Sequence, residues 1–550
     1  MLGHTVVAQV PTFDYAYAFG ATVPYTSGNI AARQSAADAV GNVYVIGRFL
    51  GAVVFGSTTL MGGSYGNDAF VAKLRPDGQW QWALKITSAE ANDIAVDNAG
   101  NVYLTGEVLS TSTFGSITLG NAGAQDVFVA KLTSAGQWLW AVSGGGPYTD
   151  NSYGITVDSG GNAYITGALH SISAAFGSTS LSGRNNQGIG LYVAKVTANG
   201  AWQWVAISTQ TNPTVVNRGN QLVLDATGNV YVAGIFYSST LTLGDSTLTN
   251  AGSSGAISND IFVAKLSAAG RWQWAIAAGG SSSDYANELV TDGNGNLYIG
   301  GELQSAMMRF GTITLGTPST SSTAAYVAKL TATGQWQWAT QSGLTTGGGS
   351  GSAFGRGLAV SADGSTYVTG FFSGRPRFGT TTLIGISQDV YVAKLMPSGQ
   401  WQWALRAGGS GNEIAHGISL DLAGNAYLTG AFSSPTLSFD AITLLNTTAP
   451  TNNLGFVARL ASMVLANTAP ATLKQTLLQL SPNPAQQAAT VAIEPVMYSR
   501  TLELLSATGQ VMRRLPLLGG SSRAHLDVAG LPSGLYVVRC GNVVRKLFVE

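Results

Sequence analysis

The chain of 550 residues has a single cysteine, Cys540, and few charges. One cysteine excludes a framework of intramolecular disulfides. Charged residues make up 10% of the chain, against roughly 25% in typical soluble domains. Basic and acidic residues both number 27, so no excess charge directs the chain to nucleic acid or to anionic lipid. No apolar run of about 18 residues occurs, so the sequence predicts no membrane-spanning helix.

Motifs for catalysis and for cofactor binding are also missing. The four histidines lie far apart and share no metal-ligand spacing. There is no Gly-x-Ser-x-Gly elbow, phosphate loop or zinc-protease helix. The recurrent Asp-x-x-Gly-Asn turns each offer one carboxylate and lack the later glutamate of an EF-hand. We therefore expect no cofactor, no metal and no catalytic residue, and the sequence does not favour an enzyme.

What the chain does contain is a long internal repeat. The segment Asp126–Leu132 (Asp-Val-Phe-Val-Ala-Lys-Leu) precedes the pair Trp138 and Trp140. Its core occurs seven times, and the middle valines stand 58, 64, 70, 64, 65 and 65 residues apart. A period of this length indicates a repeat architecture. The seven cores are residues 70–74, 128–132, 192–196, 262–266, 326–330, 391–395 and 456–460.

Each repeat holds four strand-like segments. In the second repeat these are Ile94–Asp97, Val102–Thr105, Val127–Leu132 and Trp138–Val142, with a loop containing Phe114–Leu119 before the third. Their β-branched and aromatic residues favour strands, and the Asn, Asp and Gly clusters between them favour turns. No segment has a convincing helical period. The repeat region is therefore predicted to be all-β.

The count of tryptophan pairs points to a closed ring. Six Trp-x-Trp pairs contain all 12 tryptophans, and none follows the seventh core. At the other end of the chain Phe13–Gly20 aligns with Trp401–Gly408. We predict that Asp14–Phe19 runs antiparallel beside Phe456–Leu460 as the outermost strand of the last unit. The Trp pairs themselves are expected to pack between units, because they recur uniformly.

Four-stranded units of 40–70 residues are typical of a β-propeller. The residues Ile94-Ala-Val-Asp97, Gly100-Asn-Val-Tyr103 and Phe128–Leu132 resemble the bacterial β-propeller repeat family, and the strand order is similar to that of NHL-type propellers. The resemblance covers about residues 12–460. It implies a seven-bladed β-propeller over residues 11–460, with the outer strand of the last blade taken from residues 12–20. Departures are Ser361 in place of the first-strand Asp and Arg459 in place of the third-strand Lys.

The repeat stops at residue 460 and is followed by an expected linker at 461–476. Residues 477–550 read as a small β-sandwich. The segments Ser481–Ala485, Leu526–Val538 and Arg545–Glu550 resemble the C-terminal sorting domain of type IX secretion cargo. The resemblance implies export across the outer membrane of a Bacteroidota-type bacterium by the type IX machinery; the alternative is an ordinary β-sandwich. Its sorting-motif residues are Pro482, Asn483, Pro484, Gly534, Tyr536, Lys546 and Leu547.

Residues 1–10 are expected to be the remnant of a signal peptide, because Val6-Val7-Ala8 before Gln9 is typical of a cleavage site. With a sorting domain at the other end, the expected location is the cell surface or the medium. We expect a monomer.

The expected site lies on the face that carries the long connections. In a propeller with the first strand innermost, the tight turns lie on one face and the variable connections on the other. A polysaccharide or protein ligand is expected there. The residues expected to precede the first strands at the inner mouth are Gln34, Asp93, Gly154, Gln221, Glu288, Gly357 and Gly417. The candidate ligand-binding residues are Arg48, Asp93, Glu107, Glu288 and Glu302, with Arg48, Glu107 and Glu302 expected just after second strands.

Two other functions stay open at this point. The chain could be an exported hydrolase or lyase acting on polysaccharide, or a purely structural surface protein. A clustered acidic pair in a deep central pocket would favour the enzyme, and a shallow neutral mouth would favour binding.

One further expectation concerns the cation near the end of each third strand. A charge between packed blades needs a partner, so we expect most of these cations to meet a carboxylate or a turn carbonyl. The residues are Lys73, Lys131, Lys195, Lys265, Lys329, Lys394 and Arg459.

Overall fold

The computed structural model forms two units, residues 1–463 and 464–550, which are described separately. It describes residues 11–20, 30–63, 68–183, 189–210, 217–252, 258–317, 322–344, 351–446, 452–462, 478–493, 500–506, 510–517, 521–540 and 543–550. All regular elements in these ranges are strands, so the all-β prediction is confirmed. Over the same ranges, no helix has the length and apolarity to cross a membrane. The expected signal remnant and nearly all of the expected linker lie outside the described residues.

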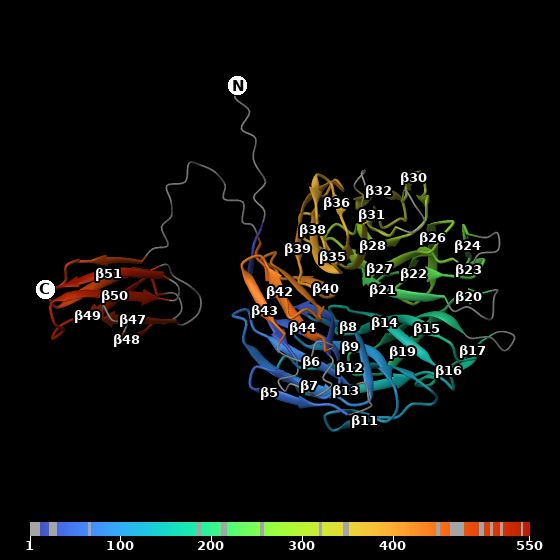
Figure 1. Ribbon diagram of the computed structural model, residues 1–550. Coiled ribbons are helices and arrows are strands. Elements are labelled where there is room, and N and C mark those ends of the chain that lie inside the picture. The colour runs from blue at the N-terminus through green and yellow to red at the C-terminus, as the bar shows by residue number, and fades with distance from the viewer. Residues whose placement is uncertain are drawn as a thin grey trace. The chain divides into compact units, whose positions relative to one another are not determined.

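The first unit is a ring of seven antiparallel four-stranded sheets that follow one another in chain order (Figure 1). The first strand of each repeat is innermost, as predicted. These inner strands begin about five residues earlier than the sequence suggested, because the segment before each apolar core also pairs with the second strand. They are β2 (Ile30–Ala37), β8 (Ala89–Val96), β14 (Asp150–Val157), β21 (Arg218–Leu224), β27 (Asp284–Thr291), β34 (Ser352–Val360) and β40 (Glu413–Leu420).

The middle strands of the blades are almost entirely buried, because each blade packs both faces against its neighbours. The second strands are β3 (Val43–Phe49), β9 (Val102–Val108), β15 (Ala163–Leu169), β22 (Val230–Phe236), β28 (Leu297–Leu303), β35 (Thr366–Ser373) and β41 (Ala426–Phe432). The third strands are β6 (Asp68–Leu74), β12 (Asp126–Leu132), β18 (Gly190–Val196), β25 (Asp260–Leu266), β31 (Ala324–Leu330), β38 (Asp389–Leu395) and β44 (Leu454–Leu460).

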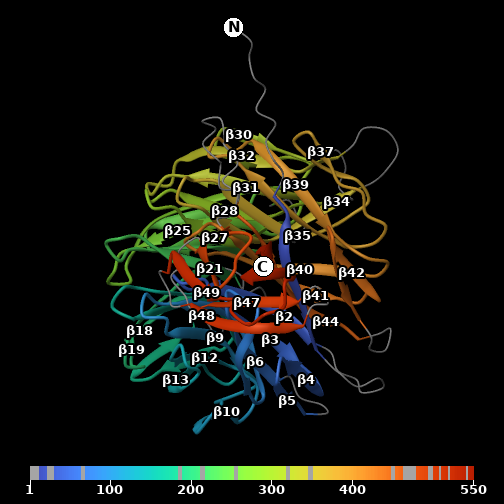
Figure 2. The same cartoon turned by 90° about the vertical axis from the view of Figure 1, so that its left-hand side faces the viewer.

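Six outer strands carry the tryptophan pairs. They are β7 (Trp80–Ile86), β13 (Trp138–Gly144), β19 (Trp202–Ile207), β26 (Trp272–Gly280), β32 (Trp336–Gln341) and β39 (Trp401–Ala407). The seventh is β1 (Phe13–Phe19), which pairs antiparallel with β44 from Phe13 opposite Leu460 to Phe19 opposite Gly455. This is the predicted closure of the ring, and Figure 2 shows the blue strands of the first blade beside the orange strands of the last.

A hairpin between the second and third strands of each repeat was not predicted as strand. Its second copy was expected to be loop. A signal was nevertheless present, since six of the seven tips read Phe-Gly or Leu-Gly and β-branched residues follow. The hairpins are β4–β5 (Ala52–Phe55, Thr58–Met61), β10–β11 (Ser112–Phe114, Ile117–Leu119), β16–β17 (Ser173–Phe176, Thr179–Ser182), β23–β24 (Thr240–Leu243, Ser246–Thr249), β29–β30 (Met308–Phe310, Ile313–Leu315), β36–β37 (Pro376–Phe378, Thr381–Thr382) and β42–β43 (Thr436–Phe439, Ile442–Leu445).

Each hairpin joins its own blade to the preceding one through the backbone. β10 pairs with the end of β7, and β29 pairs with the end of β26. Two short extensions of outer strands, β20 (Thr209–Gln210) and β33 (Gly343–Leu344), pair with β23 and β36. The other three boundaries have single bridges, Gly145 with Ala175, Gly408 with Ser438 and Gly20 with Val54. All seven boundaries of the ring are therefore linked by main-chain pairing.

The tryptophans pack between and within blades, as expected. Phe114 at a hairpin tip contacts Trp138 edge to face at 5.3 Å between ring centroids, and the same contact recurs in other blades. In the last blade Phe13 takes the tryptophan position, 5.0 Å from Phe439. The second tryptophan of a pair reaches the next blade, as Trp140 Nε1 donates to the carbonyl of Ala198.

The Asp-x-x-Gly-Asn turns are stabilised internally. Asp97 Oδ1 accepts the backbone N–H groups of Ala99 and Asn101, while Oδ2 accepts the Asn101 amide and the Tyr103 hydroxyl. The amide and hydroxyl contacts recur at Asp38, Asp158, Asp225, Asp292 and Asp421. These carboxylates act as turn-forming groups.

The prediction for the third-strand cations is wrong for most of them. A carboxylate or turn carbonyl is found for Lys73, Lys265 and Arg459 only, among the described residues. The shared partner is a second-strand tyrosine: six lysine Nζ atoms lie between 4.7 and 5.2 Å from its ring centroid. The negative face of an aromatic ring attracts a cation, by about 0.5–2 kcal/mol. In five of these blades the tyrosine hydroxyl donates to the turn aspartate. The carboxylate therefore fixes the position of the ring over which the lysine lies.

The second unit is a small two-sheet β-sandwich, as predicted. One sheet contains β45 (Leu478–Ser481), β46 (Ala488–Ile493) and β49 (Arg523–Asp527). The other contains β47 (Arg500–Ser506), β48 (Val511–Leu517), β50 (Gly534–Cys540) and β51 (Val543–Val549). Its core includes Leu504, Val538 and Leu547 from one sheet, and Val491 and Leu526 from the other. Cys540 is buried and unpaired there.

Candidate functional site

Every inner strand of the propeller contains a β-bulge at the same place. The pairing of β8 with β9 shifts register between Ala91 and Asp93, opposite Gly106. A Cβ at Gly106 would collide with the carbonyl oxygen of Glu90, so glycine is required there. A bulge redirects a side chain out of the regular alternation. The seven bulged residues form a ring, one from each blade: Arg33, Asn92, Tyr153, Asn220, Asn287, Arg356 and His416.

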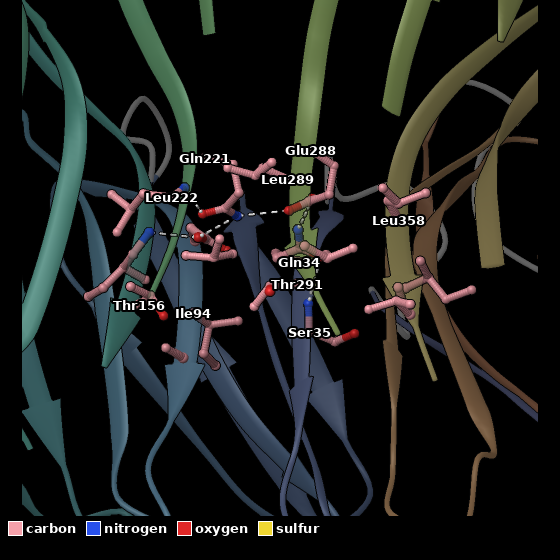
Figure 3. Close-up of a pocket in the computed structure, with 18 of the residues that line it drawn as sticks. Gln34, Ser35, Ile94, Thr156, Gln221, Leu222, Glu288, Leu289, Thr291 and Leu358 are labelled. Atoms are coloured by element: carbon pink, nitrogen blue, oxygen red, sulfur yellow. Dashed lines mark hydrogen bonds between the residues drawn. The ribbon is translucent and has the colours of Figure 1, made fainter. Parts of the chain in front are cut away.

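The next residue of each inner strand points into the central channel. These are the residues that were expected to precede the first strands; they lie within those strands instead. Four of them form one hydrogen-bonded group that we call the plug: Gln34, Asp93, Gln221 and Glu288. Figure 3 labels Gln34, Gln221 and Glu288 of this group. Gln221 Nε2 donates to both carboxylates, to Asp93 Oδ2 at 3.1 Å and to Glu288 Oε1 at 2.9 Å. Gln34 Nε2 donates to Glu288 Oε2 at 3.2 Å.

Glycines at other positions of this ring make room for the plug. A Cβ at Gly417 would collide with Gln34 Oε1, and a Cβ at Gly154 would lie 2.8 Å from Gln221 Oε1. The plug therefore depends on small residues opposite its glutamines. It divides the channel into two cavities. On the tight-turn side a cavity of about 340 Å³ is lined mainly by apolar residues such as Ile94, Leu222 and Leu358.

Burial changes the ionisation of the plug. Burial raises the pKa of Glu288 to about 8, with a smaller contribution from the nearby Asp93 charge, and glutamine hydrogen bonds oppose it. Burial also raises the pKa of Asp93 to about 6, against hydrogen bonds from the Ile155 N–H and Gln221. Near neutral pH, Glu288 therefore carries a proton.

We predict that propeller stability falls as pH rises through this range. The Glu288 pKa is raised above its unfolded value of about 4.3, so its contribution is fully present below that pH and is lost as pH rises through about 8. Glu288→Gln keeps position 288 neutral at every pH, while Asp93 still titrates in both proteins. Measured by thermal unfolding from pH 4 to pH 9, the free energy of unfolding should fall by on the order of 5 kcal/mol more in the wild type than in the variant. Parallel curves for the two proteins would contradict the assignment.

On the face of the long connections, the channel opens into a polar cavity that we call the vestibule. Its volume is about 450 Å³, and the plug forms its floor. All seven bulged residues line it, together with Arg48 and Arg218. Asparagines of the ring also connect neighbouring inner strands: Asn220 Nδ2 donates to the carbonyl of Ala286 at 2.6 Å, and Asn287 Nδ2 donates to that of Gly355 at 2.8 Å.

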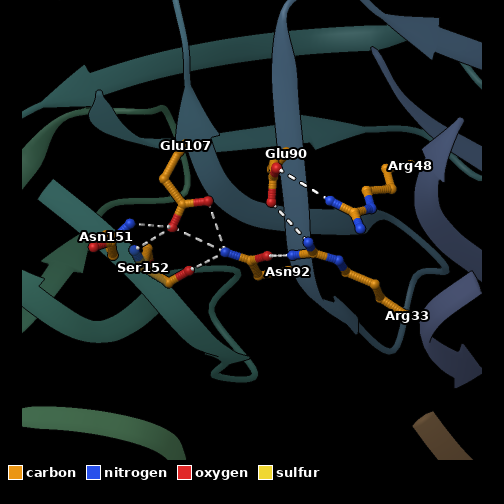
Figure 4. Close-up of polar contacts among 7 residues, drawn as sticks. All are labelled: Arg33, Arg48, Glu90, Asn92, Glu107, Asn151 and Ser152. Carbon is orange, nitrogen blue, oxygen red and sulfur yellow. Dashed lines mark hydrogen bonds and ion pairs between the residues drawn. The ribbon is translucent and has the colours of Figure 1, made fainter. Parts of the chain in front are cut away.

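A carboxylate network supports one side of the vestibule (Figure 4). Glu107 is buried and accepts hydrogen bonds from the Asn92 and Asn151 amides and from the Ser152 N–H. Burial raises the pKa of Glu107 to about 7. Beside it, Arg33 pairs with Glu90 at 2.7 Å and donates to Asn92.

Arginine gives the vestibule its positive charge. Arg48 lies 3.7 Å from Glu90, which Arg33 already binds, and its side chain is 49% exposed. Arg356 pairs with Glu302 at 3.1 Å. Arg218 lies over the ring of Tyr153, and its buried Nε has no hydrogen-bond acceptor among the described residues. The positive charge also acts on His416, whose pKa is lowered to about 4 by burial and by Arg356, Arg33 and Arg48.

The five candidate residues from the sequence thus lie around one channel. Arg48, Asp93 and Glu288 line the vestibule itself. Arg48, Glu107 and Glu302 lie in second strands, and not after them as expected. Glu107 and Glu302 orient asparagines and an arginine of the vestibule. Sequence reasoning missed Arg33, Arg218, Arg356 and His416. The signal for Arg33, Arg356 and His416 was their position directly before a channel residue, next to the recurrent glycine within the second strand.

The sorting-motif residues come together in the second unit. Asn483 Nδ2 donates to the carbonyl of Lys546 at 3.0 Å, and its Oδ1 accepts the N–H of Phe548 at 2.8 Å. Tyr536 donates to the carbonyl of Pro532. Leu547 is fully buried. The segment Ser481–Ala485 therefore holds β51 in place through Asn483.

Fold and C-terminal unit together define an exported β-propeller protein. The family described as the secretion system C-terminal sorting domain matches residues 479–549. The chain is therefore exported by type IX secretion to the cell surface or the medium.

Other comparisons are more distant. An uncharacterised WD repeat-containing protein of Acanthamoeba polyphaga mimivirus is 22% identical, over 65% of this chain and 31% of that protein, so the chain spans about a third of the relative's length. The Neurospora crassa Pan2 WD40 domain is 11% identical, with a TM-score of 0.39, over 80% of this chain and 91% of the domain. A Dyadobacter fermentans protein of unknown function is 10% identical, with a TM-score of 0.39, over 81% of this chain and 99% of that one.

Proposed function

We propose that the vestibule binds an acidic polysaccharide, one that carries carboxylate or sulfate groups. The observation that carries the proposal is the convergence of Arg33, Arg48, Arg218 and Arg356 on one cavity. A planar guanidinium donates two parallel hydrogen bonds to a carboxylate or a sulfate, so arginine suits such groups better than lysine does.

The surrounding groups support a saccharide over a simple anion. Asn92, Asn220 and Asn287 supply amides that can bind hydroxyl groups, and Tyr153 supplies an aromatic ring beside Arg218. The acids at the floor oppose an anion weakly, because Glu288 is protonated near neutral pH. Variable connections on the same face would add contacts to a longer chain.

The expected result is tighter binding to charged polysaccharides than to neutral ones. Isothermal titration with polygalacturonate or chondroitin sulfate should give binding that falls with salt, while dextran should give none. Arg48→Gln removes an exposed guanidinium and should weaken binding about tenfold or more, since a charge-assisted hydrogen bond contributes about 1.5–3 kcal/mol.

The matched control is Arg271→Gln, which removes the same charge from a tight turn on the opposite face. It should leave the affinity unchanged. Equal losses in the two variants would mean that net charge, and not the vestibule, governs binding. Equal affinity for dextran would reject the proposal.

A second candidate is cleavage of the same polysaccharide, which one observation favours. Asp93 and Glu288 form a clustered acidic pair at the floor of a central cavity, with pKa values of about 6 and 8. Such a pair can act as acid and base on a glycosidic bond. The arginines of the vestibule would hold an acidic polysaccharide in either case, so they do not distinguish binding from cleavage. New reducing ends, or absorbance from an unsaturated product, that are lost in Asp93→Asn would establish the enzyme.

A further inference from the structure

Four third strands begin with a buried aspartate on the long-connection face: Asp68, Asp126, Asp260 and Asp389. Two of these carboxylates have a cation on the adjacent outer strand. Arg406 Nε lies 2.9 Å from Asp389 Oδ2, and Lys85 Nζ lies 3.8 Å from Asp68 Oδ2.

Blades two and four lack this cation. Arg406 stands opposite Tyr391 in the strand pairing. In the same register Ser143 stands opposite Phe128, and Ala277 stands opposite Phe262. Neither residue can neutralise the aspartate that begins its partner strand.

Instead, a second buried carboxylate enters from the next blade. Asp150 and Asp284 begin the following inner strands, β14 and β27, and are fully buried. A Cβ at Gly145 would collide with Asp126 Oδ1 and would lie 3.0 Å from Asp150 Oδ2, so both oxygens face the same point. The Gly146 N–H donates to Asp150 at 2.8 Å and also faces Asp126.

In each of the two third-strand aspartates, one carboxylate oxygen receives no hydrogen bond from the described part of the chain. Asp126 Oδ1 and Asp260 Oδ1 accept no hydrogen bond from any described residue, although Asp126 is 3% and Asp260 is 1% exposed. Two buried carboxylates side by side cannot both stay charged without a counter-ion. Asp284 lies close enough to Asp260 for the two charges to repel each other.

In the sixth blade, a cationic side chain occupies the equivalent position. At Gly408, which is in register with Gly145 and Gly279, a Cβ would collide with Asp389 Oδ1 and would lie 2.8 Å from Arg406 Nη2. There the next blade again supplies an acid, Glu413, and the Arg406 guanidinium pairs with Asp389.

We propose that Asp126 with Asp150, and Asp260 with Asp284, each bind one calcium ion at the boundary between two blades. The ion takes the place that the Arg406 guanidinium holds between blades six and seven. Oxygen ligands without histidine or cysteine favour a hard cation, and calcium accepts irregular oxygen geometry. No described group combines three or more His, Cys, Asp or Glu side chains, so carbonyl or water oxygens complete the coordination.

Calcium binding to the full-length, chelator-treated protein tests the proposal. Equilibrium dialysis with metal analysis should give two calcium ions per chain, with affinities of about 10⁻⁴–10⁻³ M, as in other extracellular modules. The melting temperature should rise with calcium concentration. Asp126→Asn with Asp260→Asn should abolish both effects, while Asp389→Asn, at the boundary that already has its cation, should leave both ions bound.

The decisive variants place an arginine, equivalent to Arg406, in blades two and four. Ser143→Arg and Ala277→Arg reproduce the sixth-blade arrangement, so each should remove one calcium ion. The double variant in chelator should melt at or above the temperature of the chelated wild type. Absence of bound calcium at about 5 mM, a concentration well above the expected dissociation constants, or two ions retained in the double arginine variant, would overturn the proposal.

Discussion

Deleting residues 1–20 should lower the melting temperature of the propeller by on the order of 10 °C, with little change in the C-terminal unit. The deletion removes β1 and exposes the edge of β44 together with the apolar surface that it covers. Phe13 and Phe19 are both buried, and each contributes about 1.5–3 kcal/mol on burial. The bridge from Gly20 to Val54 is lost as well.

Calorimetry with a shorter deletion gives the control. Removing residues 1–10 leaves β1 intact and should leave the propeller transition unchanged. Phe19→Ala should have an intermediate effect of about 3–5 kcal/mol, because Phe19 packs against Phe55, Phe70 and Trp80 of the first blade. If both deletions melt alike, β1 does not close the ring in solution.

Deleting Lys546–Glu550 should stop export at the outer membrane. The deletion removes most of β51, which pairs along β50 and buries Leu547. It also removes the partners of Asn483. Cell fractionation and protease treatment of intact cells should find the truncated protein in the periplasm and little or none outside.

The complementary test uses a reporter protein that carries an N-terminal signal and, at its C-terminus, residues 477–550. The reporter should reach the surface or the medium. Normal display of the truncated chain would show that the last strand is dispensable for recognition by the secretion machinery.

Most of the fold could be predicted because the strand pattern of one blade occurs seven times in the sequence. Alternating apolar residues in segments such as Phe128–Leu132 define strands that are buried on both faces, and the missing Trp pair identified β1. The hairpins were harder to predict, since strands of three or four residues such as β10 and β11 give a weak pattern alone. They become stable only against an outer strand of the preceding blade, which is a tertiary contact.

The site was predicted only in part, for a physical reason. Regular alternation along an inner strand places Gln34 and Asp93 toward the channel, and the sequence pattern shows that alternation. A bulge breaks it and turns Arg33, Arg356 and His416 toward the mouth. The bulge needs a glycine on another strand, such as Gly106 opposite Ala91, where a Cβ would collide with the bulged backbone. Arg218 joins them from an earlier position of β21, which no local pattern indicates.

The pairing of β1 with β44 also sets how the ring responds to mechanical force. Phe13, where β1 begins, lies opposite Leu460, where β44 ends, so both ends of the propeller leave it at the same edge of one blade. Tension applied between these ends loads the backbone hydrogen bonds one after another, as in a zipper, and not all together in shear. Pulling the chain by its ends should therefore separate β1 from β44 within the last blade at low force, before any other blade unfolds.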